Sequence, residues 1–300
     1  MTEEADRQLP QGDEIFLDHV GHFVRDATAA VGALERAGFA PTPVSVQANP
    51  DGTPTGTGNV CAMFARGYVE CLFKSADTPL GAELDAAMAR YAGIHLAAFG
   101  VADAETELRR LGGAGFPLRP LVQFQRPVET ERGPSTAAFT VARVERGAMA
   151  EGRIQSLTHR TEAAVWQPRW LVHRNGARAL ASAVIAVADV DEAAERFARF
   201  TNRAATPTLD GRTIHLDRGR IELVTRRAFE SALPEIAIPG LPFIGACGIA
   251  VASLAALEKL LRSAGVRTRR ADELLVVPFP GELGQGAWLF FEDSQATPFP

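Results

Sequence analysis

The chain repeats one pattern of local structure four times, and this repeat restricts the possible folds more than any other feature. Each copy has an apolar strand, a residue suited to cap a helix, a helix of about three turns, and a β-rich stretch ending in a hairpin. The predicted helix caps are Asp26, Asp103, Asp189 and Ser253. Single helices that alternate with several short strands favour an α+β fold over a doubly wound one.

The first two copies are the most alike. Ala37-Gly38-Phe39 ends the first predicted helix and Ala114-Gly115-Phe116 ends the second; in both, the Phe lies 13 residues after the cap (39 minus 26, 116 minus 103). Glycine just after a helix is a common stop signal. Hairpin turns also repeat, as Arg66-Gly67 in the first copy and Arg218-Gly219 in the third.

An Asn175-Gly176 turn separates the second copy from the third. We therefore expect an N-terminal domain at residues 14–175 and a C-terminal domain at residues 176–300. Residues 1–13 are polar and acidic, without the apolar segment of a signal peptide, and we expect a disordered tail there.

Charge and composition exclude several classes of partner. The chain has 31 basic and 36 acidic residues and no dense basic run, so we expect no nucleic-acid partner. No apolar run approaches the roughly 20 residues that span a bilayer, so we expect no membrane partner. Cys61, Cys71 and Cys247 are too few for a disulfide framework. These features predict a cytoplasmic protein.

Three motifs carry a resemblance to a known superfamily. Leu17-Asp18-His19-Val20 before the Asp26 cap resembles the opening strand of vicinal oxygen chelate proteins. Gly67-Tyr68-Val69-Glu70-Cys71-Leu72 resembles the closing strand of their modules, where Glu is a common metal ligand. The stretch 158–177 resembles a signature of a glyoxalase-like subgroup.

The resemblance implies four βαβββ modules, paired into two open, curved mixed β-sheets with helices on the outside. It also implies a pocket inside the paired modules, with one divalent metal (Zn, Mn, Fe or Ni) held by His and Glu side chains. The implied function is a metal-dependent lyase or isomerase that acts on a small oxygenated carbonyl compound. Two alternatives remain open: a metal-free small-molecule binding protein of the bleomycin-resistance type, and a ring-cleaving dioxygenase-like protein.

His19 and Glu70 are the first candidate metal ligands, because they belong to strands expected to be neighbours. His95 is the third, although it lies one residue away from the position that matches His19. In a regular strand it would point to the opposite face, and a bulge would be needed to bring it back. The alternative for His19 and Glu70 is a structural hydrogen bond between buried side chains.

Catalytic roles are assigned to Glu70 and His159. His159 could complete the metal site or transfer a proton, because the pKa of a free imidazole lies near neutrality; a structural hydrogen bond is the alternative. Residues that could bind substrate share the predicted pocket face or follow its last strand: Gln155, His159, Phe124, Arg126 and Trp166.

The third and fourth copies lack most of the candidate ligands. Ser182 and Ala246 stand where the first copy has His19, and Leu289 stands where it has Glu70, although Glu222 keeps the acid. We therefore expect a structural or dimer-forming C-terminal half, a small-molecule substrate or ligand for the N-terminal half, and leave a homodimer open.

Overall fold

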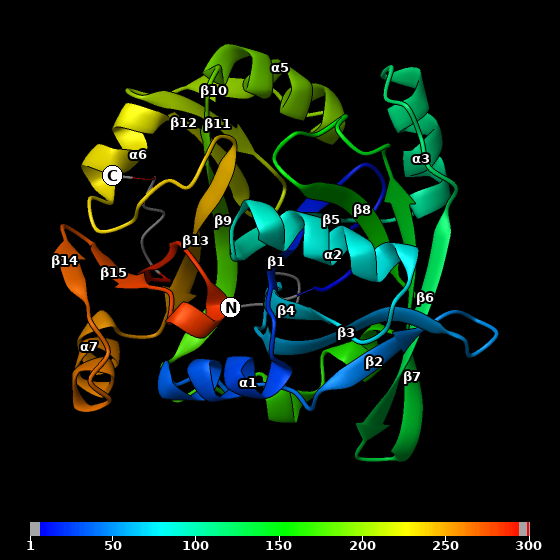
Figure 1. Cartoon of the computed structure of the whole chain (residues 1–300), viewed down its shortest axis with the longest axis horizontal. Helices are drawn as coiled ribbons and strands as arrows, with labels where there is room; N and C mark the ends of the chain where they lie inside the picture. Colours follow the sequence, from blue (N-terminus) through cyan, green and yellow to red (C-terminus); the bar gives the residue numbers. More distant parts are fainter. Residues whose placement is uncertain (1–6, 294–298, 300) are drawn as a thin grey trace.

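The computed structural model describes residues 7–293 and residue 299. In this part a strand, a helix and three strands follow one another four times (Figure 1). The first copy comprises β1 Ile15–Phe23, α1 Ala27–Arg36, β2 Ser45–Ala48, β3 Pro54–Met63 and β4 Tyr68–Lys74. The second comprises β5 Gly93–Val101, α3 Ala104–Gly113, β6 Val122–Thr130, β7 Gly133–Arg143 and β8 Arg153–His159.

The third copy comprises β9 Ala177–Val187, α5 Val190–Thr201, β10 Ala205–Pro207, β11 Gly211–His215 and β12 Arg220–Thr225. The fourth comprises β13 Phe243–Val251, α7 Leu254–Ser263, β14 Arg269–Ala271, β15 Leu274–Pro278 and β16 Ala287–Glu292. Further helices lie between the copies: α2 Pro79–Arg90, α4 Glu162–Val165, the 3-10 helix Pro168–Trp170 and α6 Arg226–Ala232; the 3-10 helix Gly281–Leu283 lies within the fourth copy, between β15 and β16.

The four predicted helix caps are confirmed. The side chains of Asp26, Asp103, Asp189 and Ser253 each accept a hydrogen bond from a backbone N–H in the first turn of their helix. After α1 and α3 the chain turns at Gly38 and Gly115, with φ of 83° and 84°. This left-handed backbone favours glycine and explains why both helices stop there.

The strands of the N-terminal half close into a barrel, in the order β1-β4-β3-β2-β6-β7-β8-β5, with β5 paired back to β1. The mixed α+β class and the curvature are confirmed, but the open sheet predicted for this half is wrong. Closure depends on β2 meeting β6, where Ala48 pairs with Gln125. Because the two would otherwise be edge strands with unpaired backbone groups, their meeting satisfies hydrogen bonds that an open sheet leaves exposed.

The C-terminal strands form an open sheet, in the order β10-β11-β12-β9-β13-β16-β15-β14. Helix α6 packs against β12 and β9 and, with the segment after it, places Phe229, Leu233 and Phe243 in a buried cluster on this sheet. Glu222 is also buried; it accepts hydrogen bonds from Arg220 Nε and the Phe299 backbone N–H. The position that matches Glu70 is therefore already paired within the chain.

The two halves are joined by reciprocal contacts of the repeated Arg-Gly turns. The Leu180 backbone N–H donates to the Arg66 carbonyl, and the Leu17 N–H donates to the Arg218 carbonyl. Strands β5 and β13 also pair, through Ile94 and Ile244. These contacts fix the start of β1, from which the candidate site is built.

Residues 7–10, part of the predicted tail, are packed against the rest of the chain, whereas residues 11–13 are exposed. Arg7 forms an ion pair with Glu14, Gln8 donates to the Ala65 carbonyl and Pro10 is buried. Residues 1–6 lie outside the described part. No helix in the described part is long and apolar enough to cross a membrane.

Candidate functional site

The interior of the N-terminal barrel contains a small cavity of about 50 Å³ that is lined by both polar and apolar side chains. On one side lies an apolar cluster that includes Phe23 and Leu96 and that Leu84 of α2 enters from outside. On the other side lies a second cluster, with Met63, Tyr68 and Trp166. The polar side chains that line the cavity are His19, Gln47, Asn59, Glu70, Gln125, Arg126, Arg143, Arg153 and Gln155.

His19 and Glu70 meet in this cavity. They come from parallel neighbours β1 and β4, and both are buried. His19 Nε2 lies 3.5 Å from Glu70 Oε2, and Asn59 Nδ2 donates to Glu70 Oε1 at 2.6 Å. The ring of Tyr68 stacks on the His19 imidazole with centroids 4.4 Å apart. The structure therefore brings the two predicted side chains together, with Nε2 of His19 facing Oε2 of Glu70.

Asp18 orients His19 and was not predicted as a site residue. The pairing of β1 with β5 shifts register between Leu17 and His19, so Asp18 is the extra residue of a β-bulge. Its Oδ1 lies 2.6 Å from His19 Nδ1, and its Oδ2 lies 2.9 Å from His159 Nε2. Burial alone would raise the pKa of Asp18, but the charge and hydrogen bonds of the two histidines outweigh it and lower that pKa.

His159 supports this arrangement from behind the cavity. It is buried against Phe139 and Trp166, with ring centroids 5.1 and 4.5 Å away, and it is not among the cavity-lining residues. Trp166 likewise packs in the apolar cluster and does not line the cavity. His159 therefore contacts Asp18, which in turn holds His19, so His159 acts on His19 as a positioning residue.

His95 lies in a different place. A register irregularity between β1 and β5 does occur beside it, but its ring stacks on Tyr91 at 3.9 Å and its Nε2 lies 2.7 Å from the Tyr91 carbonyl oxygen. Burial lowers the pKa of His95 to about 4. The structure therefore does not bring His95 to His19 and Glu70.

The remaining predicted binding residues do line the cavity. Gln155 Oε1 accepts from Arg143 Nε at 2.9 Å, and the Arg143 guanidinium lies over the Phe124 ring, 5.0 Å from its centroid. Arg126 is buried, and its Nε has no hydrogen-bond partner in the described part of the chain. An unpartnered buried guanidinium at a cavity wall is a ready partner for an anionic oxygen.

These side chains do not complete a metal site. His19 Nε2 and Glu70 Oε2 are spaced like two ligands of one ion, and Asp18 and Asn59 fix them as outer partners of ligands do. However, no group of three or more His, Cys, Asp or Glu side chains among the described residues could hold a metal. Arg126, Arg143 and Arg153 line the same cavity and oppose a divalent cation electrostatically.

The sequence and its fold place the chain in a family. Residues 17–201 match the family described as glyoxalase-like domain, which covers both copies of the barrel and the start of the third. The chain belongs to this family and so to the vicinal oxygen chelate superfamily, as its motifs predicted. No curated protein matches the sequence.

Solved structures share the fold along almost the whole chain. A hypothetical protein from Staphylococcus aureus is similar with a TM-score of 0.63 at 9% identity, over 93% of this chain and 99% of that one. A mutant 4-hydroxymandelate synthase from Streptomyces coelicolor has a TM-score of 0.58 at 15% identity, over 95% and 94%. A fusion protein of a xylose isomerase-like TIM barrel and a 4-hydroxyphenylpyruvate dioxygenase has 0.60 at 13%, over 97% and 51%. At these identities the likeness establishes the fold alone.

Proposed function

We propose that the chain is an enzyme of the lyase or isomerase type that transfers a proton on a small oxygenated carbonyl compound inside the N-terminal barrel. The observation that carries this proposal is the buried arrangement Asp18–His19–Glu70. Asp18 holds Nδ1 of His19, so Nε2 faces the cavity 3.5 Å from the free oxygen of Glu70. A carboxylate that fixes the tautomer and orientation of a histidine is a common device in acid–base sites.

Each group has a role in removing a proton next to a carbonyl. Glu70 Oε2 takes the proton as the C–H bond breaks, and the electron pair moves onto the carbonyl oxygen. Arg126, buried without a partner for its Nε among the described residues, stabilises the negative oxygen that results. His19 Nε2, next to Glu70, relays the proton to its new position. No step requires a metal, because the donors present do not complete a site for one.

A second candidate function is ligand sequestration without chemistry. It is favoured by the aromatic side chains Tyr68, Phe124 and Phe139 in the cavity wall, and by the incomplete set of metal donors. A ring-cleaving dioxygenase receives less support, since the same donor set would have to hold iron.

Hydrogen exchange tests the enzyme directly. The protein is incubated in D₂O with a panel of small 2-hydroxycarbonyl and 2-oxocarbonyl compounds, and exchange of the proton next to the carbonyl is followed by ¹H NMR. We expect exchange with at least one compound, reduced about 100-fold or more in Glu70→Gln. His215→Gln, at an exposed strand position, is the matched control and should exchange normally.

The outcomes separate the candidates. Saturable binding of panel compounds without exchange would favour sequestration and overturn the proposed enzymatic function.

Elemental analysis of protein purified without chelators, beside a His19→Ala variant, tests whether the chain binds a metal. About one Zn, Mn, Fe or Ni per chain that disappears in the variant would contradict the metal-free mechanism and restore the metal site predicted from the motifs.

A further inference from the structure

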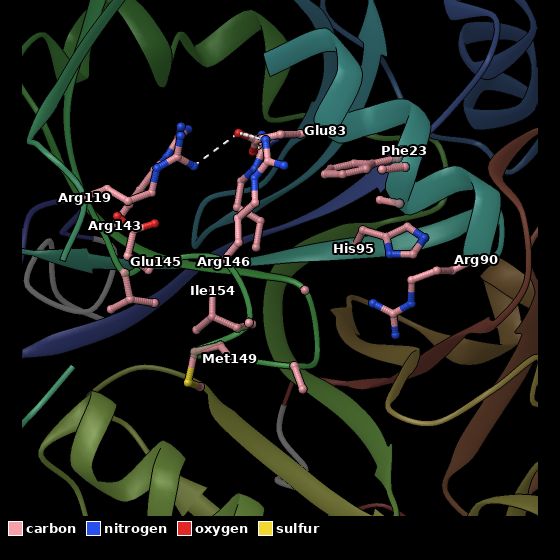
Figure 2. A pocket seen from close by; sticks show the side chains of 17 residues that line it. Phe23, Glu83, Arg90, His95, Arg119, Arg143, Glu145, Arg146, Met149 and Ile154 are labelled. Carbon is pink, nitrogen blue, oxygen red and sulfur yellow. Dashed lines mark hydrogen bonds and ion pairs between the residues drawn. The ribbon is translucent and has the colours of Figure 1, made fainter. Parts of the chain in front are cut away.

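A second cavity, of about 290 Å³, lies between α2 and the turn that connects β7 to β8 (Figure 2). Its lining contains the five arginines Arg90, Arg119, Arg143, Arg146 and Arg153. Only Glu83 and Glu145 oppose them, so the lining has an excess of three positive charges with His95 neutral. This excess contrasts with the whole chain, whose net charge is −5.

One carboxylate, that of Glu83, forms the ion pairs that partly neutralise these arginines. Glu83, on α2, lies 2.6 Å from Arg146, 3.2 Å from Arg119 and 3.4 Å from Arg153. Figure 2 shows Glu83, Arg119 and Arg146 near one another on one side of the cavity, while His95 and Arg90 lie on another. A single negative charge shared among three guanidinium groups leaves them only partly neutralised.

Arg143 forms no ion pair with an acidic side chain in the described part of the chain, although the more distant charge of Glu83 favours its charged form. Its side chain is 6% exposed and donates through Nε to the neutral amide of Gln155. Burial, and then the nearby charge of Arg153, lower the pKa of Arg143 to about 9. Burying a cation without a counter-charge is costly, and a bound anion removes that cost.

We propose that this cavity binds the oxyanion of a small molecule, a carboxylate or a phosphate, through Arg143, Arg146 and Arg153. A planar guanidinium presents paired donors that match two oxygens of either group. The volume lies at the lower limit for small-molecule pockets, which suits a ligand of few atoms.

Arg143 and Arg153 line the barrel cavity as well as this one. An anion held here therefore lies beside the wall of the proposed catalytic site. It follows that the substrate is an anionic oxygenated carbonyl compound, whose charged end is held at these arginines and whose reactive end faces His19 and Glu70. This last step rests on the proposed function; the binding of the anion does not.

Isothermal titration calorimetry of the whole chain at low ionic strength, with inorganic phosphate and separately with malonate, tests the binding. We expect one saturable site, weakened about tenfold in Arg146→Gln, which removes an exposed partner without disturbing the core. Glu83→Gln removes the carboxylate that competes with the anion, so this variant should bind the anion several-fold more tightly. If the two residues were merely structural, the two substitutions would not change the anion affinity in opposite directions. Arg262→Gln, on the exposed face of α7, is the control.

The outcomes are distinct. Binding of phosphate alone identifies a phosphate group as the ligand, and binding of malonate alone identifies a carboxylate. Absence of saturable binding, or binding that Arg146→Gln and Glu83→Gln leave unchanged, overturns the proposal. Anion binding with no hydrogen exchange on any panel compound leaves this site standing and rejects the proposed function.

Discussion

Asp18 and His159 are 141 residues apart in the sequence, yet Asp18 Oδ2 lies 2.9 Å from His159 Nε2 in the buried centre of the barrel. The contact joins the first strand of the first module to the last strand of the second. Because the other oxygen of Asp18 holds His19, the orientation of the candidate catalytic imidazole depends on the pairing of the two modules through β1, β5 and β8.

Asp18→Asn removes the charge between the two histidines and keeps the side-chain shape. We expect the free energy of unfolding at pH 7 to fall by about 2 kcal/mol, as for loss of a charged hydrogen bond. The folded state lowers the pKa of Asp18 from 3.8, so its stabilisation is present above that pH and is lost as the pH falls below it. The difference between variant and parent should therefore shrink in acid.

Urea denaturation at several pH values measures this effect. Asp26→Asn is the matched control, because Asn caps a helix about as well as Asp. A loss in Asp18→Asn no greater than in the control would show that Asp18 does not stabilise the barrel centre.

Buried histidines should make the fold sensitive to mild acid. Burial lowers the pKa of both His22 and His95 to about 4, and also lowers the pKa of His173. Below pH 6.5 the unfolded chain takes up protons that the folded chain does not. Stability should therefore fall between pH 6.5 and 4, with a slope approaching about 1.4 kcal/mol per pH unit for each histidine.

The variants His22→Gln and His215→Gln compare the effect of a buried histidine on the pH dependence of stability with that of an exposed one. His22 Nδ1 lies 3.0 Å from the Leu283 carbonyl, whereas His215 is exposed. The first variant should show a shallower loss of stability with falling pH, and the second should follow the parent chain. Equal slopes for all three proteins would contradict this account.

Much of the fold follows from local sequence signals. Helix starts and stops depend on neighbouring residues, so the caps and the Gly38 and Gly115 turns were predictable. Closure of the barrel was not, because it depends on how far the sheet curls before β2 meets β6. Helix α2 was missed although Thr78-Pro79 is a good helix start, since the repeat offered no place for a fifth helix.

The alternation of side chains along strands is also a local signal, and it accounts for where several of the expected site residues lie; their roles stay predictions. His19, Glu70, Gln155, Phe124 and Arg126 line the cavity, as strand alternation predicts. That rule fails at a bulge, where Asp18 and His19 can both serve the site although they are adjacent. The three arginines that pair with Glu83 come from a loop, a turn and a strand end, and no periodic pattern relates them.

Leu84 of α2 should be important for stability although it lies outside the repeat. It is fully buried in the apolar cluster at one side of the cavity. Leu84→Ala is expected to lower the free energy of unfolding by about 3 kcal/mol through lost burial and a new void. Leu209→Ala, at a leucine that is 98% exposed, should change it little. Comparable losses in the two variants by chemical denaturation would contradict the packing role.

Gly67 joins the two halves at the point where β1 is held. Its φ is +72°, and a Cβ there would lie 2.7 Å from the Asp18 carbonyl oxygen, which belongs to the backbone and cannot move aside cheaply. Gly67→Ala should therefore destabilise the chain by at least about 1–2 kcal/mol and disturb the Asp18–His19 contact. Gly113→Ala is the matched control, because its Cβ meets open space at the end of α3 and alanine favours a helix. Thermal unfolding of both variants measures the contrast; a Gly67→Ala chain as stable as the control would mean that this turn does not constrain the start of β1.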